Sequence, residues 1–189
     1  MQVEYMIYAY GAICISLIVF NIIYNLSLRR SESRMERRCR RIRAEMDEQL
    51  DRLSRGQPVD EKHLDYLSGK LKRVKNLIAF DRVLQSFPRG DEVSEAYFQQ
   101  IQPIVLHLAA IYCGREAMQA AYFSYLLSRY MTTRQMPVDS LEEILLDYVR
   151  KDNLYCRVNS LEALYAIGTP MSIVRALEIQ DAGSVFLHE

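Results

Sequence analysis

The 189-residue chain has no tryptophan and only seven glycines, five prolines and three histidines. So few glycines and prolines leave little material for the many tight turns of a β-sandwich or barrel. The four cysteines, Cys14, Cys39, Cys113 and Cys156, show no CxxC spacing, which indicates neither a disulfide framework nor a metal site. We therefore expect reduced thiols on a cytosolic body. With 50% hydrophobic and 25% charged residues, the composition excludes a disordered chain and favours an all-α fold.

Catalytic signatures are also missing. His63, His107 and His188 are far apart in the sequence, and the chain has no Gly-rich phosphate loop and no serine in an elbow motif. Cysteines such as Cys113 and Cys156 are more often buried as small hydrophobic residues than used as nucleophiles. We therefore expect no enzymatic activity, no metal site and no cofactor.

One long segment lacks charge altogether, because no Asp, Glu, Lys, Arg or His occurs from Tyr5 to Leu28. As a helix, at about 1.5 Å per residue, this segment is roughly 36 Å long and crosses a bilayer with some tilt. Buried core helices are usually shorter, and a cleaved signal peptide needs a basic start. Residues 1–28 are therefore predicted to be a single-pass transmembrane anchor. Asn21 and Asn25 share a face of it, where they either bond a second transmembrane helix or are hydrated near the headgroups.

Charge is sorted along the chain although the formal net charge is zero. Residues 29–43 carry eight Arg and two Glu, whereas residues 91–189 carry thirteen acidic and seven basic residues. Because cations beside a span stay on the cytoplasmic side, we expect a cell-membrane protein with its N-terminus outside and its body in the cytoplasm. The arginines are expected to bind anionic lipid headgroups rather than nucleic acid, since no aromatic residues interleave with them. They are Arg29, Arg30, Arg34, Arg37, Arg38, Arg40, Arg41 and Arg43.

Residues 29–56 are predicted to form a basic juxtamembrane helix. Its apolar positions recur every three or four residues in one narrow stripe, which consists of Met35, Cys39, Ile42, Met46, Leu50 and Leu53. Such a stripe is typical of a short coiled-coil seam or of a helix that lies on the membrane. Gly56 to Asp60 ends this helix, and residues 57–90 are expected to form a helical cap or connector, mainly one helix from Asp60 to about Phe87.

The rest of the chain, residues 91–189, is predicted to form short antiparallel helix pairs. The segment from Tyr155 to Gly168, followed by Thr169, Pro170 and residues 173–177, resembles the second helix of a HEAT repeat that runs into the first helix of the next repeat. Residues 120–127 occupy the equivalent place about 38 residues earlier. The resemblance implies a short HEAT-like α-solenoid, and a non-repetitive helical bundle is the alternative. About two and a half repeats are fewer than the three normally needed, so we expect helix 60–87, a partner or further sequence to cover an open end.

Three local patterns refine these helices. Ser140 to Glu143 forms a capping-box pattern, which predicts that a helix begins there. Gly168 is expected to take a left-handed conformation at a helix end. Asp181 to Gly183 is expected to interrupt the last helix, which begins at Pro170.

The resemblance also implies a function, namely that of a membrane-anchored cytoplasmic scaffold or adaptor. Its protein partner is unknown, and bacterial envelope machinery or a membrane glycosyltransferase is the candidate. HEAT-like solenoids commonly bind through the second helix of each pair, so the partner-binding candidates are Gln119, Tyr122, Arg129, Asn159, Glu162 and Tyr165. The buried side of helix 155–167 is expected to hold Val158, Leu161, Leu164 and Ile167.

Several alternatives stay open. The rings of Tyr122 and Tyr165 either bind the partner or pack between neighbouring helices. The chain as a whole is either an adaptor, a ligand-binding or sensing module that holds a tetrapyrrole or a nucleotide, or a structural homo-oligomer built from the span and the basic helix.

Overall fold

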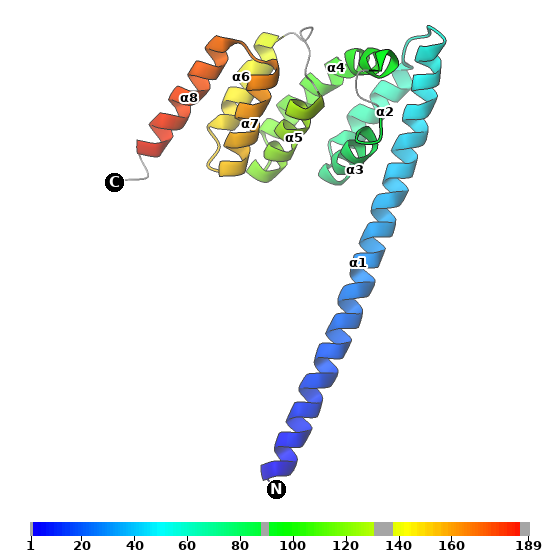
Figure 1. The fold of residues 1–189 in the computed structure, drawn as a ribbon, viewed down its shortest axis with the longest axis vertical. Helices are drawn as coiled ribbons and strands as arrows, with labels where there is room; N and C mark the ends of the chain where they lie inside the picture. Colours follow the sequence, from blue (N-terminus) through cyan, green and yellow to red (C-terminus); the bar gives the residue numbers. More distant parts are fainter. Residues whose placement is uncertain (1, 88–90, 131–137, 186–189) are drawn as a thin grey trace.

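The computed structural model describes residues 2–87, 91–130 and 138–185, and within these ranges it contains eight α-helices and no strand. The prediction of an all-α fold is thus confirmed. Figure 1 shows a long helix, α1, that rises beside one end of a row formed by the seven shorter helices. We call this row, together with the part of α1 that packs on it, the body.

Helix α1 runs without a break from Gln2 to Ser54, so the predicted anchor and juxtamembrane helix are one helix of 53 residues. The chain contains no proline before Pro58 and no glycine between Gly11 and Gly56, so nothing interrupts the backbone hydrogen bonds. The helix ends at Ser54, and the chain turns at Gly56, whose φ of 74° is readily adopted only without a side chain.

The apolar stripe of α1 packs on the body of its own chain, so neither predicted role, a coiled-coil seam or a membrane-lying face, is correct. Ile42 and Met46 are 3% and 1% exposed, and α1 contacts α3 and α4. Gln49 is buried as well, and its Oε1 accepts a hydrogen bond from the backbone N–H of Asp60 at 2.9 Å. The second half of α1 is therefore part of the hydrophobic core.

Residues 57–90 contain two helices where one was predicted, α2 (Glu61–Leu71) and α3 (Val74–Leu84). Arg73 between them has extended backbone angles, and Asn76 Nδ2 donates to the Lys70 carbonyl at 2.9 Å across the turn. This turn lets α3 fold back along α2 and bury Leu77 and Phe80. The apolar spacing in the sequence continues through this turn as if one helix ran on. Packing of α3 on the rest of the body divides the segment into two helices.

The remaining helices are α4 (Glu92–Cys113), α5 (Ala117–Tyr130), α6 (Val138–Val149), α7 (Leu154–Ile167) and α8 (Pro170–Val185). Helix α4 continues through Pro103. Helix α8 begins at Pro170, as predicted, but continues through residues 181–183, so the predicted interruption is wrong.

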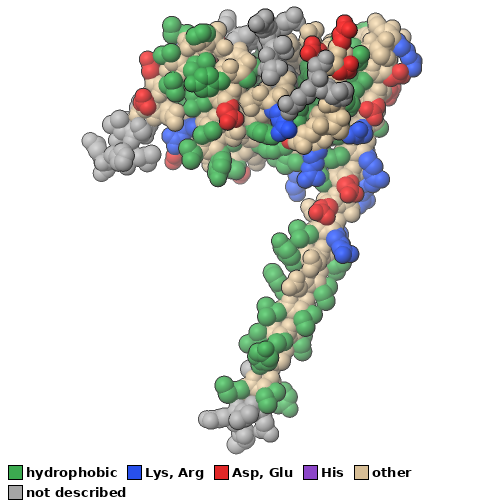
Figure 2. Space-filling model, in the orientation of Figure 1, with side chains coloured by type: hydrophobic (Ala, Val, Ile, Leu, Met, Phe, Trp, Pro, Cys, Tyr) green, Lys and Arg blue, Asp and Glu red, His purple; other side chains and the backbone are tan. Residues whose placement is uncertain are grey.

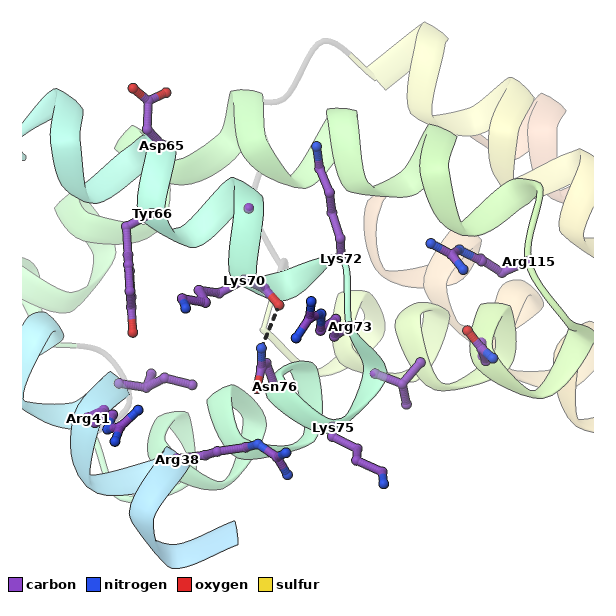
Figure 3. A pocket seen from close by; sticks show the side chains of 14 residues that line it. Arg38, Arg41, Asp65, Tyr66, Lys70, Lys72, Arg73, Lys75, Asn76 and Arg115 are labelled. Atoms are coloured by element: carbon purple, nitrogen blue, oxygen red, sulfur yellow. Dashed lines mark hydrogen bonds between the residues drawn. The ribbon is translucent and has the colours of Figure 1, made fainter. Parts of the chain in front are cut away.

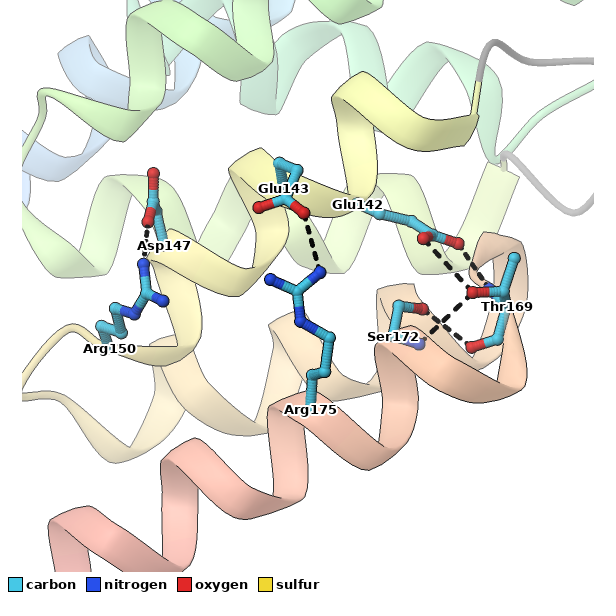
Figure 4. Close-up of polar contacts among 7 residues, drawn as sticks. All are labelled: Glu142, Glu143, Asp147, Arg150, Thr169, Ser172 and Arg175. Atoms are coloured by element: carbon cyan, nitrogen blue, oxygen red, sulfur yellow. Dashed lines mark hydrogen bonds and ion pairs between the residues drawn. The ribbon is translucent and has the colours of Figure 1, made fainter.

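The capping-box prediction is also wrong, because α6 begins at Val138, before Ser140. Glu142 and Glu143 instead hold α8 in place (Figure 4). Glu142 Oε1 accepts from the Thr169 backbone N–H at 2.5 Å, and Arg175 donates to Glu143 at 2.8 Å. Both acidic side chains are therefore used between helices rather than at a helix end.

Gly168 has a φ of −85°, so the left-handed conformation predicted for it is wrong. A Cβ at this position would lie 2.6 Å from the Leu164 carbonyl oxygen and 2.7 Å from Ser172 Oγ. Glycine is required here because α7 and α8 approach closely, not because of an unusual backbone conformation.

The seven helices after α1 are arranged in two layers. Helices α2, α4, α6 and α8 contact one another in succession, and α3, α5 and α7 do the same. In the first layer the Tyr112 hydroxyl donates to the Leu71 carbonyl at 2.7 Å, and the Tyr148 hydroxyl donates to the Ala109 carbonyl at 2.6 Å. The partners in these bonds are 41 and 39 residues apart, so the same kind of contact joins successive helix pairs.

Candidate membrane and partner interfaces

The first half of α1 exposes a long apolar surface. Tyr5 is 72% exposed and Leu28 is 45% exposed, and the large hydrophobic side chains between them have exposures in a similar range. By length and composition, this helix is able to cross a membrane. Figure 2 shows its hydrophobic side chains extending away from the body. An exposed apolar surface of this extent marks an interaction with a membrane or another protein.

Asn21 and Asn25 are partners within α1. Asn25 Nδ2 donates to the Asn21 carbonyl at 2.9 Å and to its Oδ1 at 3.3 Å. Part of the hydrogen-bonding capacity of these amides is therefore satisfied inside one helix.

The eight predicted membrane-surface arginines have two environments. Arg38 is half-buried beside the body, and Arg43 contacts Ser86 Oγ and lies 5.9 Å from the centre of the Phe87 ring. The others are exposed along the part of α1 that follows Leu28; they are Arg29, Arg30, Arg34, Arg37, Arg40 and Arg41. The basic segment thus runs from the end of the apolar surface to the first contacts with the body.

Cations from α1, α2, α3 and the connections α2–α3 and α4–α5 line a groove beside α1, which we call the basic groove. It has a volume of about 1010 Å³, and its wall includes Asp65, Tyr66, Asn76 and Gln119 as well as seven cationic side chains. Figure 3 shows these side chains around the groove, with the guanidinium of Arg115 pointing into it and the chains of Lys72 and Lys75 extending in opposite directions. The seven cations are Arg38, Arg41, Lys70, Lys72, Arg73, Lys75 and Arg115.

Of the seven cations of this groove, the sequence-based prediction included only Arg38 and Arg41, because residues 60–87 were expected to form one connecting helix. The signal that could have found the others is the density of charge, four cations within six residues at Lys70, Lys72, Arg73 and Lys75. Arg115 gives no comparable signal in the sequence, because only the fold brings it close.

The three partner-binding candidates of α5 have different environments. The Tyr122 hydroxyl donates to Asp81 Oδ2 at 2.8 Å, and Tyr130 donates to Asp81 Oδ1 at the same distance. Burial and the bond to Asp81 raise the pKa of Tyr122. The Tyr122 hydroxyl therefore links α5 to α3. Gln119 is half-buried in the wall of the basic groove. Arg129 is exposed, and its guanidinium lies 5.8 Å from the centre of the Tyr125 ring.

The candidates on α7 are mostly on its outer side. Glu162 is exposed and Tyr165 is 62% exposed, whereas Asn159 is half-buried and donates to the Tyr155 carbonyl at 2.8 Å. The expectation for Val158 is wrong, because this side chain is 42% exposed.

Small residues occupy the side of α7 that faces α5. Ser160 and Ala163 are fully buried, and the hydroxyls of Ser124 and Ser160 lie 3.1 Å apart across the two helices. Small side chains allow this close approach. Larger apolar side chains are left on the surface of α7 and α8 (Figure 2): Tyr155, Val158, Tyr165, Met171, Val174 and Leu177.

Two titratable groups in the core have shifted pKa values. His63 is 3% exposed and hydrogen-bonded to Tyr97 at 2.9 Å, and desolvation lowers its pKa to about 4 although Asp60 opposes the shift. Burial raises the pKa of Cys156 and so disfavours its thiolate. Among the residues that the structure describes, no three His, Cys, Asp or Glu side chains form a group that could hold a metal ion.

No protein-family model matches the chain, and no curated protein or solved structure is significantly similar to it.

Proposed function

We propose that this protein is a single-pass membrane adaptor whose helical body holds a protein partner at the cytoplasmic face. The observation that carries the proposal is the continuity of α1. Its first half exposes a helix long and apolar enough to cross a bilayer, and one face of its second half is buried in the core of the body. A helix shared in this way fixes the distance between the membrane and the body, as an adaptor requires.

The arginines that follow Leu28 support the proposed orientation. Cations retained beside a span place the body in the cytoplasm and the N-terminus outside. At about 1 kcal/mol per cation near an anionic surface, they also attract the lipid headgroups.

The layers of the body support a short HEAT-like solenoid. The pairs α2–α3, α4–α5 and α6–α7 follow one another, and similar hydrogen bonds from Tyr112 and Tyr148 join one pair to the next. In this proposal the second half of α1 covers the first pair, in place of the cap expected from residues 57–90. Stacked pairs of this kind commonly present an extended surface to a protein partner.

The partner surface that we propose lies on α7 and α8. Tyr155 and Tyr165 are 66% and 62% exposed, and Met171 is 69% exposed. Exposed tyrosines are frequent anchors of interfaces because they bury a large area at a low entropic cost. Glu162, exposed on the same side of α7, supplies charge at the edge of this surface.

Capture from native membranes tests the proposal. A tagged full chain is cross-linked in cells, purified in mild detergent, and compared with a Tyr155→Ser, Tyr165→Ser variant. We expect the main captured protein to be lost, with an unchanged melting temperature because both rings are exposed. The matched control is Met118→Ser, which removes a 56% exposed apolar side chain from α5 and should leave capture intact. Equal capture by the wild type and the double variant would show that this surface is not the docking site.

A second candidate, a module that senses an anionic ligand, is favoured by the basic groove.

A further inference from the structure

The basic groove concentrates positive charge without neutralising it. Among the residues that the structure describes, seven cationic side chains line it together with one carboxylate, that of Asp65, which points away from Arg38 and Arg41 in Figure 3. Within the described residues, none of the seven forms an ion pair with an acidic side chain. Like charges in one concave surface repel one another and attract anions strongly.

One backbone acceptor in the wall of the groove is already occupied, because the Lys70 carbonyl accepts from Asn76 Nδ2 at 2.9 Å. This carbonyl at the end of α2 would otherwise repel an anion. The groups left for a ligand are therefore mainly donors, namely the ammonium and guanidinium ends.

These donors fit phosphate better than a nucleotide base. Guanidinium groups bind phosphate through forked hydrogen bonds, and lysine ammonium groups bind it as compact charges. Tyr66 supplies the aromatic ring among the described residues of the wall. The Lys70 ammonium lies over this ring, 5.5 Å from its centre, so the ring is not free to stack on a base. The chemistry of these side chains therefore suits a phosphate group better than a whole nucleotide.

The position of the groove identifies the source of the phosphate. Arg38 follows Leu28 by ten residues on one continuous helix, a distance of about 15 Å along its axis. Figure 1 shows the α2–α3 and α4–α5 connections on the side of the body from which the apolar half of α1 extends, and Figure 2 shows Lys and Arg side chains gathered where α1 meets the body. The groove therefore opens near the headgroups of the membrane that holds α1.

We propose that the basic groove binds the phosphate of an anionic lipid headgroup in that membrane. Lys70, Lys72, Arg73, Lys75 and Arg115 bind it together with the arginines of α1. The lipid then contacts both α1 and the body, and it holds the side of the body near the groove against the bilayer. This inference rests on the membrane attachment in the proposed function, but not on the identity of any protein partner.

Competition between two lipids tests the inference on the full chain in detergent. The protein is incubated with equimolar phosphatidylglycerol and phosphatidylcholine, and bound lipid is counted by native mass spectrometry. We expect a preference for phosphatidylglycerol that falls by about tenfold or more in a Lys72→Gln, Arg73→Gln, Arg115→Gln variant. All three side chains are exposed, so the fold should be retained, which a melting curve checks.

The matched control is Arg55→Gln, Lys62→Gln, Arg82→Gln, which removes the same charge from exposed positions outside the groove and should keep the preference. An equal loss in both variants, or in neither, overturns the inference. Inorganic phosphate is the second probe: if it binds through the same three residues and phosphatidylglycerol does not, the ligand is a free phosphate and the lipid is excluded. Flotation of the full chain with liposomes tests the anchor separately, so failure of the groove and failure of the membrane attachment give different results.

Discussion

Met46 lies in the part of α1 that packs on the other helices of the body. Its replacement measures how much the stability of the body depends on this helix. The side chain is 1% exposed and contributes to a small cavity of about 10 Å³ that Leu84, Phe87 and Tyr97 also line. Truncation of a buried methionine to alanine costs about 2–5 kcal/mol, through lost burial and the larger cavity that remains. For a domain of this size, a loss of about 3 kcal/mol lowers the melting temperature by roughly 6–12 °C.

The assay is thermal unfolding, followed by circular dichroism, of a soluble body comprising residues 31–189. The matched control is Met171→Ala, the same chemical change at a side chain that is 69% exposed, for which we expect a shift of less than about 0.5 kcal/mol. If Met46→Ala melts together with the control, then the second half of α1 is not part of the core, and the independent basic helix expected from the sequence is correct.

Three further predictions concern the core, the contact between α7 and α8, and the orientation in the membrane. Because the pKa of His63 is about 4 in the folded state against an ordinary 6.5, the unfolded state binds the proton first and stability falls as the pH drops from about 6.5 to about 4. Urea unfolding across this range should show a loss of about 3 kcal/mol that is absent in His63→Gln, and equal pH slopes would refute this. Gly168→Ala should destabilise the body by about 1–3 kcal/mol in melting experiments, since its Cβ would meet the Leu164 carbonyl at 2.6 Å, whereas Gly69→Ala, with no atom within 4 Å, should not. A reporter fused after Glu189 should be active inside the cell, and activity only outside would reverse the topology.

Part of this architecture follows directly from local sequence. The apolar run from Tyr5 to Leu28 has no charged residue, so its composition alone indicates a helix able to cross a membrane. Helix positions in the body follow from apolar residues at spacings of three and four, and Pro170 marks the start of α8 as expected. These features are determined by neighbours in the chain.

Other features depend on contacts between distant residues. The stripe that contains Ile42 and Met46 indicates that one face of α1 is buried, but the same spacing fits a second chain, a membrane or the body itself. Likewise, the apolar pattern continues across Lys72 and Arg73, where α2 ends and α3 turns back to pack on α1. A pattern within one segment does not specify the surface on which that segment packs.

The basic groove shows the same limit for a functional site. Lys70 to Lys75 form a dense cluster of charge in the sequence, yet Arg38 and Arg115 join it only because α1 and α5 pack beside the α2–α3 turn. Conversely, Tyr122 was a candidate for partner binding because of its residue type, and its hydroxyl is engaged by Asp81 within the body. Which polar side chains are available to a ligand follows from the fold.

The central claim is that α1 holds the body at the membrane with the basic groove toward the headgroups. Since the chain contains no tryptophan, a single introduced one reports its own position. Energy transfer from the tryptophan of Lys72→Trp or Lys62→Trp to dansyl-labelled headgroups is measured for the full chain in anionic nanodiscs. Lys72 lines the groove, whereas Lys62 lies in the first turn of α2, just beyond the end of α1 that is far from the membrane. The account predicts clearly stronger transfer from position 72, and equal or stronger transfer from position 62 would contradict it.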